Sequence, residues 1–271
     1  MGGFRRWGGP SYRVYGYGGG GGVRFGWGLT PVIKRLIIIN AVIYFGLVLL
    51  TILARPLASN VIYTLGVVPR DVAFGFRFWQ PFTYLFLHSP TTFWHIFFNM
   101  FALWMFGTPL ERDWGGRRFL RYYLLTGVGA GLLNVVVTLL WGGPGVGIPT
   151  VGASGSIYGI LLAFGVLYPR TPILVWFLFP VPARIFVMVF GAMAFLSALQ
   201  GPGSGVSHVS HLGGMVFGYV LLRGGWLYGR VLNRYVGWKL GQARRKFDVY
   251  MGEQDEQDRE RERPRPDRWV N

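Results

Sequence analysis

Six apolar stretches, several of them close to the length needed to cross a membrane, constrain the fold of this chain more than any other feature. They cover residues 32–54, 95–107, 119–141, 151–168, 184–199 and 206–222. A helix needs about 20 mainly apolar residues to cross a bilayer, and the charged residues, 14% of the chain, avoid these stretches. Soluble domains usually carry about 25% charged residues. The sequence therefore predicts an all-α polytopic membrane protein with six transmembrane helices.

Three regions follow from this pattern: a tail over residues 1–30, a membrane domain over 31–223 and a second tail over 224–271. The first tail is basic, rich in Gly, Arg and Tyr, and without apolar periodicity, so it is predicted to be disordered. The second tail is charged. Inside the membrane domain, the connection 55–94 is long and aromatic, which favours an element partly embedded at the membrane interface. The first apolar stretch is longer than the apolar region of a signal peptide, so we expect it to remain as a helix.

The distribution of positive charge predicts the orientation in the membrane. Arg and Lys cluster before the first stretch, between the second and third, between the fourth and fifth, and after the sixth, whereas residues 142–150 and 200–205 contain neither. Because positive residues mark cytoplasmic loops, both termini are predicted to be cytoplasmic, with His95, Ser154 and His211 near the outer face. This topology accounts for the net charge of +16, so no nucleic-acid partner is expected.

Two residues with potential chemistry lie inside these stretches, where polar groups are costly and usually functional. Ser154 follows the Gly- and Pro-rich segment 142–149 at the start of the fourth stretch, and His211 lies in the sixth. A serine hydroxyl needs a neighbouring base to become a nucleophile, and histidine is the usual one. Neither stretch contains Asp or Glu. The pair therefore predicts a Ser–His dyad without an acidic third member, at the floor of a water-filled cavity.

Three further residues are placed to support this dyad. Tyr158 lies one helical turn after Ser154 and can pack on the ring of His211, or simply fill a helix interface. His95 and Asn99 are four residues apart, hence on one helix face. Together with the backbone N–H of Ser154 they can form an oxyanion hole. The alternative for Asn99 is a hydrogen bond between helices.

Glycines at helical spacing predict how the fourth and sixth stretches meet. They are Gly155, Gly159, Gly214 and Gly218, with Gly152 just before the first of them. Small residues let membrane helices approach closely, and such contact would bring the imidazole of His211 to Ser154. His208 lies one turn nearer the polar connection, so we predict for it a wet, supporting role, with measurable activity when it is replaced.

Other hydrolytic chemistries lack their residues. The chain contains no His-Glu-x-x-His string for a zinc protease, no pair of membrane aspartates and no cysteine. The absence of cysteine removes thiol nucleophiles, disulfides and cysteine-bound metals. The segment Gly152-Ala153-Ser154-Gly155-Ser156 lacks the last glycine of the serine elbow found in soluble hydrolases. No metal is therefore predicted.

From about residue 78 to 222, the chain resembles the bacterial rhomboid family of intramembrane serine proteases. The motifs that carry the resemblance are His95-x-x-x-Asn99, Gly152-x-Ser154-Gly155 with Tyr158, and His211-x-x-Gly214-x-x-x-Gly218. The resemblance implies a six-helix rhomboid-like bundle in a bacterial inner membrane, with Ser154 as nucleophile and His211 as base. It implies that His95 and Asn99 are the oxyanion donors. It also implies cofactor-free cleavage of transmembrane protein substrates, whereas no oligomeric state follows from it.

Features of the connection 55–94 also bear on the resemblance. Phe86-Leu87-His88 matches a weaker family motif. Gln80 follows Trp79 where some members have Arg, and residues 89–94 form a slightly long segment. These departures affect details of the loop and not the chemistry.

Two alternative functions differ in what they require of the sequence. A catalytically inactive rhomboid relative, acting as a binding factor, would lack the serine or the histidine, and this chain has both Ser154 and His211. A small six-span transporter would line its path with the same two residues. Such transporters are built from internal repeats, and the sequence shows none.

Overall fold

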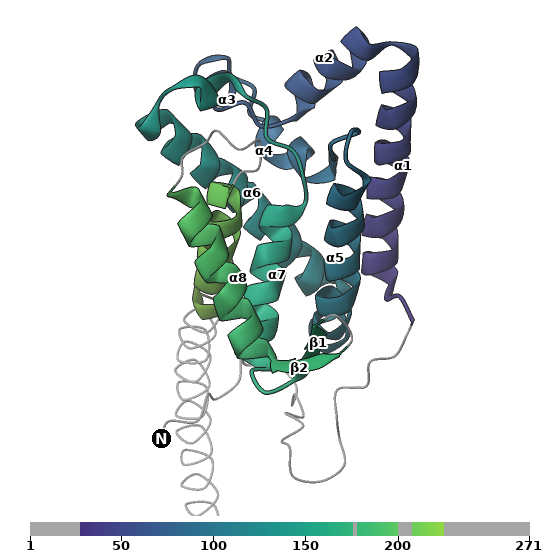
Figure 1. The fold of residues 1–271 in the computed structure, drawn as a ribbon, viewed down its shortest axis with the longest axis vertical. Helices are drawn as coiled ribbons and strands as arrows, with labels where there is room; N and C mark the ends of the chain where they lie inside the picture. Colours follow the sequence, from purple (N-terminus) through teal and green to yellow (C-terminus); the bar gives the residue numbers. More distant parts are fainter. Residues whose placement is uncertain (1–27, 176–177, 200–207, 225–271) are drawn as a thin grey trace, which may run out of the picture. The chain divides into compact units, whose positions relative to one another are not determined.

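The computed structural model of the protein describes residues 28–175, 178–199 and 208–224, which are mostly helical (Figure 1). Apart from Gly224, these residues belong to one compact unit, Tyr12–Arg223. The two predicted tails fall almost entirely outside the described residues, as does the connection 200–205. The prediction of a mainly helical protein is confirmed.

Six helices of the described residues follow the six predicted stretches. They are α1 (Pro31–Leu53), α5 (Phe93–Trp114), α6 (Gly116–Trp141), α7 (Ser154–Leu167), α8 (Ala183–Ala198) and the helix over residues 208–224. By length and composition, α1 and α6 can cross a membrane, with 23 and 26 residues. The apolar helices α7 and α8 are shorter, with 14 and 16 residues. A short helix suits the membrane interior only where its ends meet protein or water.

The second predicted stretch is longer in the structure than the sequence indicated. We expected it to end at 107, before the charged residue Glu111, but α5 continues to Trp114 and ends at Gly115, whose φ is +77°. Glu111 is buried, and its carboxylate accepts hydrogen bonds from the backbone N–H groups of Val32 and Ile33, both at 2.9 Å. These are N–H groups at the start of α1 that have no partner within that helix. The carboxylate of Glu111 therefore lies inside the fold, where it caps the start of α1.

One part of the all-α prediction was wrong. Between α7 and α8, strand β1 (Pro172–Val175) pairs antiparallel with β2 (Phe179–Pro182), with Ile173 opposite Val181. Prolines interrupt this segment, and proline lacks the N–H that a helix interior requires. A two-stranded ribbon tolerates proline because both strands are edge strands. The apolar run after residue 172, which lies outside the predicted fifth stretch, is therefore a hairpin.

The aromatic connection 55–94 folds into short helices. These are α2 (Arg55–Leu65), α3 (Pro69–Phe74), α4 (Gln80–Thr83) and the 3-10 helix η1 (Tyr84–Phe86). The rings of Phe74, Phe76 and Phe78 point outward and are largely exposed. Gln80 is fully buried: its side chain accepts from the N–H of Val68 and donates to the carbonyl of Tyr63, both at 3.0 Å. Gln80 thus joins the end of α2 to the start of α3.

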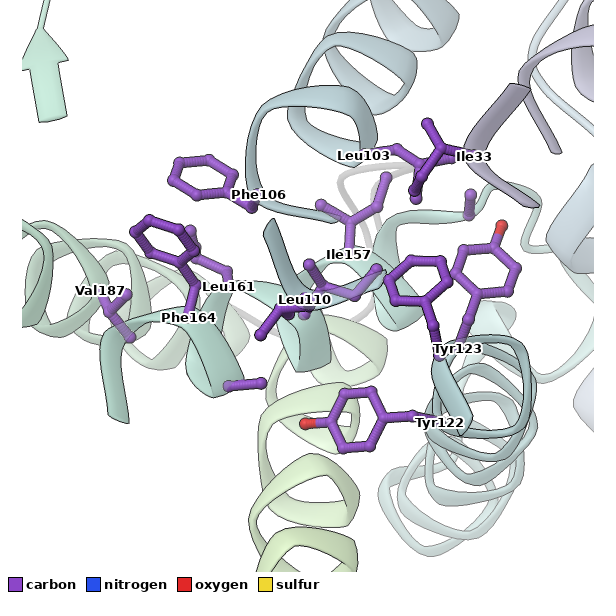
Figure 2. Packing of buried hydrophobic residues seen from close by; sticks show 14 of the residues in the cluster. Ile33, Leu103, Phe106, Leu110, Tyr122, Tyr123, Ile157, Leu161, Phe164 and Val187 are labelled. Atoms are coloured by element: carbon purple, nitrogen blue, oxygen red, sulfur yellow. The ribbon is translucent and has the colours of Figure 1, made fainter. Parts of the chain in front are cut away.

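The helix α7 lies at the centre of the hydrophobic core. Its buried residues Ile157, Leu161 and Phe164 are surrounded by residues of α1, α5, α6 and α8 (Figure 2). The ring of Phe106 on α5 meets Phe164 edge-on at 5.2 Å. Because close-packed interiors resist displacement, the first residue of α7 has a defined position.

Candidate active site

Ser154 is the first residue of α7, and its backbone position is set by the residues just before it. The 3-10 helix η2 (Pro144–Gly147) leads to Thr150, which pairs with Val67 through two hydrogen bonds of 2.9 and 2.8 Å. Gly152 then adopts a φ of +128° and donates its N–H to the carbonyl of Tyr84 at 3.0 Å. Residues with a Cβ rarely adopt this φ, so glycine is needed here. The aromatic connection thereby holds the segment that presents Ser154.

The side chains of Ser154 and His211 are within hydrogen-bond distance. The Nε2 atom of His211 lies 2.9 Å from the Oγ atom of Ser154. His211 is buried, and within the described ranges its Nδ1 atom has no hydrogen-bond partner. The ring of Tyr158 stacks on the imidazole, with centroids 4.2 Å apart and planes 8° apart. Stacking fixes the plane of the imidazole where an acidic third residue would otherwise orient it.

The two helices that carry these residues touch through their backbones. A Cβ added to Gly214 would lie 1.8 Å from the carbonyl oxygen of Gly155. One turn along, a Cβ on Gly218 would lie 3.1 Å from the Cα of Gly159. Any larger residue at these positions would force the helices apart. The glycine spacing seen in the sequence therefore corresponds to direct contact between α7 and residues 208–224.

Of the two predicted oxyanion donors, His95 lies beside the serine, and Asn99 lies one helical turn further along α5. A Cβ on Gly152 would be 2.9 Å from the Nε2 atom of His95 and 3.8 Å from the Oγ atom of Ser154, so both groups flank this glycine. The side-chain amide of Asn99 donates to the carbonyl of His95 at 2.6 Å. An amide NH₂ has two hydrogens, so this bond leaves one for a ligand. The role of these two residues as donors stays a prediction.

Histidines other than the dyad also gather here. The ring of His208 meets that of His211 edge-on at 5.7 Å and is partly buried. His88, to which the sequence assigned no role, is fully buried, and its ring lies 5.2 Å from that of His95. Burial, with His95 nearby, lowers the pKa of His88 to about 3, so it is neutral at physiological pH. In the sequence, the segment Phe86-Leu87-His88, which matches a weaker family motif, was the feature that pointed to this histidine.

Comparison with known proteins identifies this arrangement. The Rhomboid domain family matches residues 75–228, more than half of the chain. This chain belongs to the rhomboid family. The matched region contains Ser154, His211, His95 and Asn99.

Similar rhomboid proteins come from mitochondria and from bacteria. The chain is 33% identical over 160 residues to Rhomboid protein 1, mitochondrial, of Saccharomyces cerevisiae, covering 59% of this chain and 45% of the yeast protein. It is 31% identical over 143 residues to Rhomboid protease GluP of Bacillus subtilis, covering 53% of this chain and 25% of GluP. With Rhomboid protease AarA of Providencia stuartii it shares 29% identity over 214 residues, 73% of each protein. The chain thus spans less than half of the first two relatives.

Proposed function

We propose that this rhomboid protein is an intramembrane serine endopeptidase that cleaves other membrane proteins in or near their transmembrane segments. The observation that carries the proposal is the 2.9 Å separation between Ser154 Oγ and His211 Nε2. A serine and a neutral histidine at this distance form the pair that nucleophilic hydrolysis requires. Relatives named as rhomboid proteases support it.

The reaction follows from the positions of these groups. His211 Nε2 takes the proton of the Ser154 hydroxyl while Oγ attacks the carbonyl carbon of the scissile peptide. Negative charge develops on the carbonyl oxygen, and the proposed donors are the backbone N–H of Ser154 and the side chains of His95 and Asn99. A single donor of this kind is worth about 3–4 kcal/mol. The imidazolium then protonates the leaving amine, and the peptide C–N bond breaks to give an acyl-enzyme.

Water completes the cycle, and α7 is short enough to admit it. His211 removes a proton from a water molecule, which attacks the acyl carbon and releases Ser154. Since α7 has 14 residues, it spans about 21 Å of the roughly 30 Å hydrocarbon core. At least one of its ends therefore lies below the membrane surface, and we assign this position to the Ser154 end, where a polar cavity must reach it. The partly exposed state of Ser154 fits such access.

The proposed topology has six spans, both termini in the cytoplasm and the dyad near the outer face, in a bacterial inner membrane. The positive residues Lys34 and Arg35 near the start of α1 and Arg112 near the end of α5 support this orientation, since these helices are antiparallel. Reporter fusions at both termini test it. An external terminus, or an odd number of spans, contradicts it.

Labelling with a fluorophosphonate, mapped to a residue, tests the catalytic proposal. The full chain should be labelled on Ser154, and Ser154→Ala should lose both labelling and cleavage of a model transmembrane substrate. Ser156→Ala is the matched control, because Ser156 lies about 200° around α7 from Ser154 and its Oγ atom donates to the carbonyl of Tyr123 at 2.7 Å. It should keep labelling. Substantial cleavage by Ser154→Ala contradicts the proposal.

The two nearby histidines separate a catalytic role from a supporting one. His211→Ala should be as inactive as Ser154→Ala, and the double variant no worse, because paired catalytic residues act as a unit. His208→Ala should retain measurable cleavage. An inactive relative or a transporter would show no covalent labelling in any of these variants. Cleavage that requires His208 but not His211 would overturn the assignment.

A further inference from the structure

An apolar groove of about 340 Å³ lies between α1 and α5, on the outside of the helices. The α1 wall includes Ile37, Ala41 and Phe45, and the α5 wall includes Phe97, Phe101 and Trp104. At 100° per residue, these three α5 residues lie on the face opposite Asn99. The groove is therefore separate from the active site, although α5 contributes to both.

The wall formed by α5 is a continuous row of contacting rings. The rings of Phe97 and Phe101 are nearly parallel, with planes 7° apart and centroids 6.1 Å apart. Phe101 in turn contacts Trp104 at 5.9 Å. Such mutual packing restricts their rotamers before any ligand arrives, which lowers the entropic cost of binding. The groove is thus a preformed surface.

A lysine continues the α1 wall beyond the end of the groove. Lys34, Ile37, Ala41 and Phe45 follow the spacing i, i+3, i+7 and i+11, so they share one face of α1. The side chain of Lys34 is exposed, and among the described residues it forms no ion pair. Its ammonium is therefore placed to meet an anion at the cytoplasmic end.

The spacing of lysine and groove fits one lipid leaflet. From Lys34 to Phe45 is eleven residues, or about 16 Å along a helix. Half of a bilayer's hydrocarbon core is about 15 Å. The distance from Lys34 to Phe45 therefore matches one phospholipid of that leaflet, with its headgroup at the lysine and an acyl chain along the groove.

We infer that this groove binds an anionic phospholipid of the cytoplasmic leaflet, with an acyl chain between α1 and α5 and the phosphate paired with Lys34. The assignment to that leaflet rests on the proposed membrane orientation, but not on proteolysis. A ligand that binds the folded state stabilises it in proportion to the logarithm of its concentration over Kd. Bound lipid therefore holds α5 against α1.

The test uses the full chain in detergent, with added phosphatidylglycerol or phosphatidylcholine of identical acyl chains. Native mass spectrometry should show one phosphatidylglycerol retained per protein, with weaker retention of phosphatidylcholine, and Tm should rise accordingly. Lys34→Gln should abolish the preference for phosphatidylglycerol. Ala41→Trp, which fills the groove, should abolish retention of both lipids. Arg35→Gln is the matched control: it removes the same charge from an exposed position about 100° around α1, and it should behave as the unaltered chain.

Several results would overturn the inference. Equal retention of the two lipids by the unaltered chain removes the role of Lys34, and equal losses in Lys34→Gln and Arg35→Gln indicate general surface charge. A dimer that Ala41→Trp disrupts would assign the face to a second copy instead. Fluorophosphonate labelling of the same samples separates this inference from the proposed function, since Lys34, Arg35 and Ala41 do not contact the dyad. Failure of labelling with intact lipid retention contradicts only the protease proposal.

Discussion

Replacing Gly214 by alanine tests whether backbone contact between α7 and residues 208–224 sets the dyad. The added methyl group would lie 1.8 Å from the carbonyl oxygen of Gly155. A comfortable carbon–oxygen contact is about 3.3 Å, so the helices must separate locally by about 1.5 Å. The obstacle is backbone, which cannot rotate away as a side chain can.

That displacement is large compared with the tolerance of the dyad. The Oγ–Nε2 distance is 2.9 Å, and a shift of about 1.5 Å would carry it beyond hydrogen-bond range. A misplacement of about 1 Å can reduce turnover roughly 100-fold, equivalent to about 2.7 kcal/mol in the barrier. Overpacking also destabilises a core by about 1–3 kcal/mol. We therefore expect Gly214→Ala to lower kcat at least 100-fold and to lower Tm.

Cleavage of a transmembrane substrate and the rate of fluorophosphonate labelling measure the loss of kcat in Gly214→Ala. Thermal unfolding in detergent measures the loss of Tm. Gly46→Ala is the matched control, because a Cβ on this α1 glycine would meet no atom within 4 Å. It should keep full activity and gain up to about 1 kcal/mol from helix propensity. Activity of Gly214→Ala within threefold of the unaltered chain would refute the reasoning.

Three further substitutions test single contacts. Glu111→Ala leaves the N–H of buried Ile33 without its acceptor and should lower the free energy of unfolding by about 1–3 kcal/mol. Glu111→Gln keeps an acceptor and should lose less. Equal losses in the two variants would mean that helix capping by Glu111 does not cause the loss of stability. Tyr158→Phe keeps the ring on His211 and should keep kcat. Tyr158→Leu should lower kcat about 2–10-fold, as expected for the loss of an aromatic contact of about 0.5–1.5 kcal/mol. A normal kcat for Tyr158→Leu would show that stacking on His211 is dispensable. Burial lowers the pKa of His88 from 6.5 to about 3, so the unfolded chain binds the His88 proton more tightly than the folded chain does. The contribution of neutral His88 to the free energy of unfolding is therefore full above pH 6.5. This contribution should fall by up to about 1.4 kcal/mol per pH unit as the pH is lowered from 6.5 to 3. His88→Gln should remove this fall from a pH series of unfolding measurements. An unchanged slope in His88→Gln argues against a buried neutral ring.

The helices could be predicted from the sequence because their signals are local. An apolar stretch, a glycine every three or four residues and a polar residue inside a stretch can each be recognised from the residues of a single stretch. For the same reason, Ser154 and His211 stood out as candidates before their 2.9 Å contact was known. The glycine spacing also indicated which two helices meet, since only small residues permit close approach.

Other features depend on residues distant in the chain, and no local pattern reveals them. Glu111 marked the end of a span when considered with its charged neighbours, but its carboxylate caps α1 from 78 residues away. Gln80 stood out only as a departure from the family, yet it holds the aromatic connection through bonds to Val68 and Tyr63. The hairpin after α7 combines an apolar run with prolines, and strand pairing decided its state.

By itself, then, the sequence determined the mostly helical fold, the order of the helices and the two residues most able to do chemistry, because burial in a membrane imposes length and polarity on every local segment. The tertiary structure decided where α5 ends, how Gly152 and Tyr84 hold the segment before Ser154, and that His88 lies against His95. Those outcomes arise from hydrogen bonds and ring contacts across the fold, whose partners are chosen only when the helices pack.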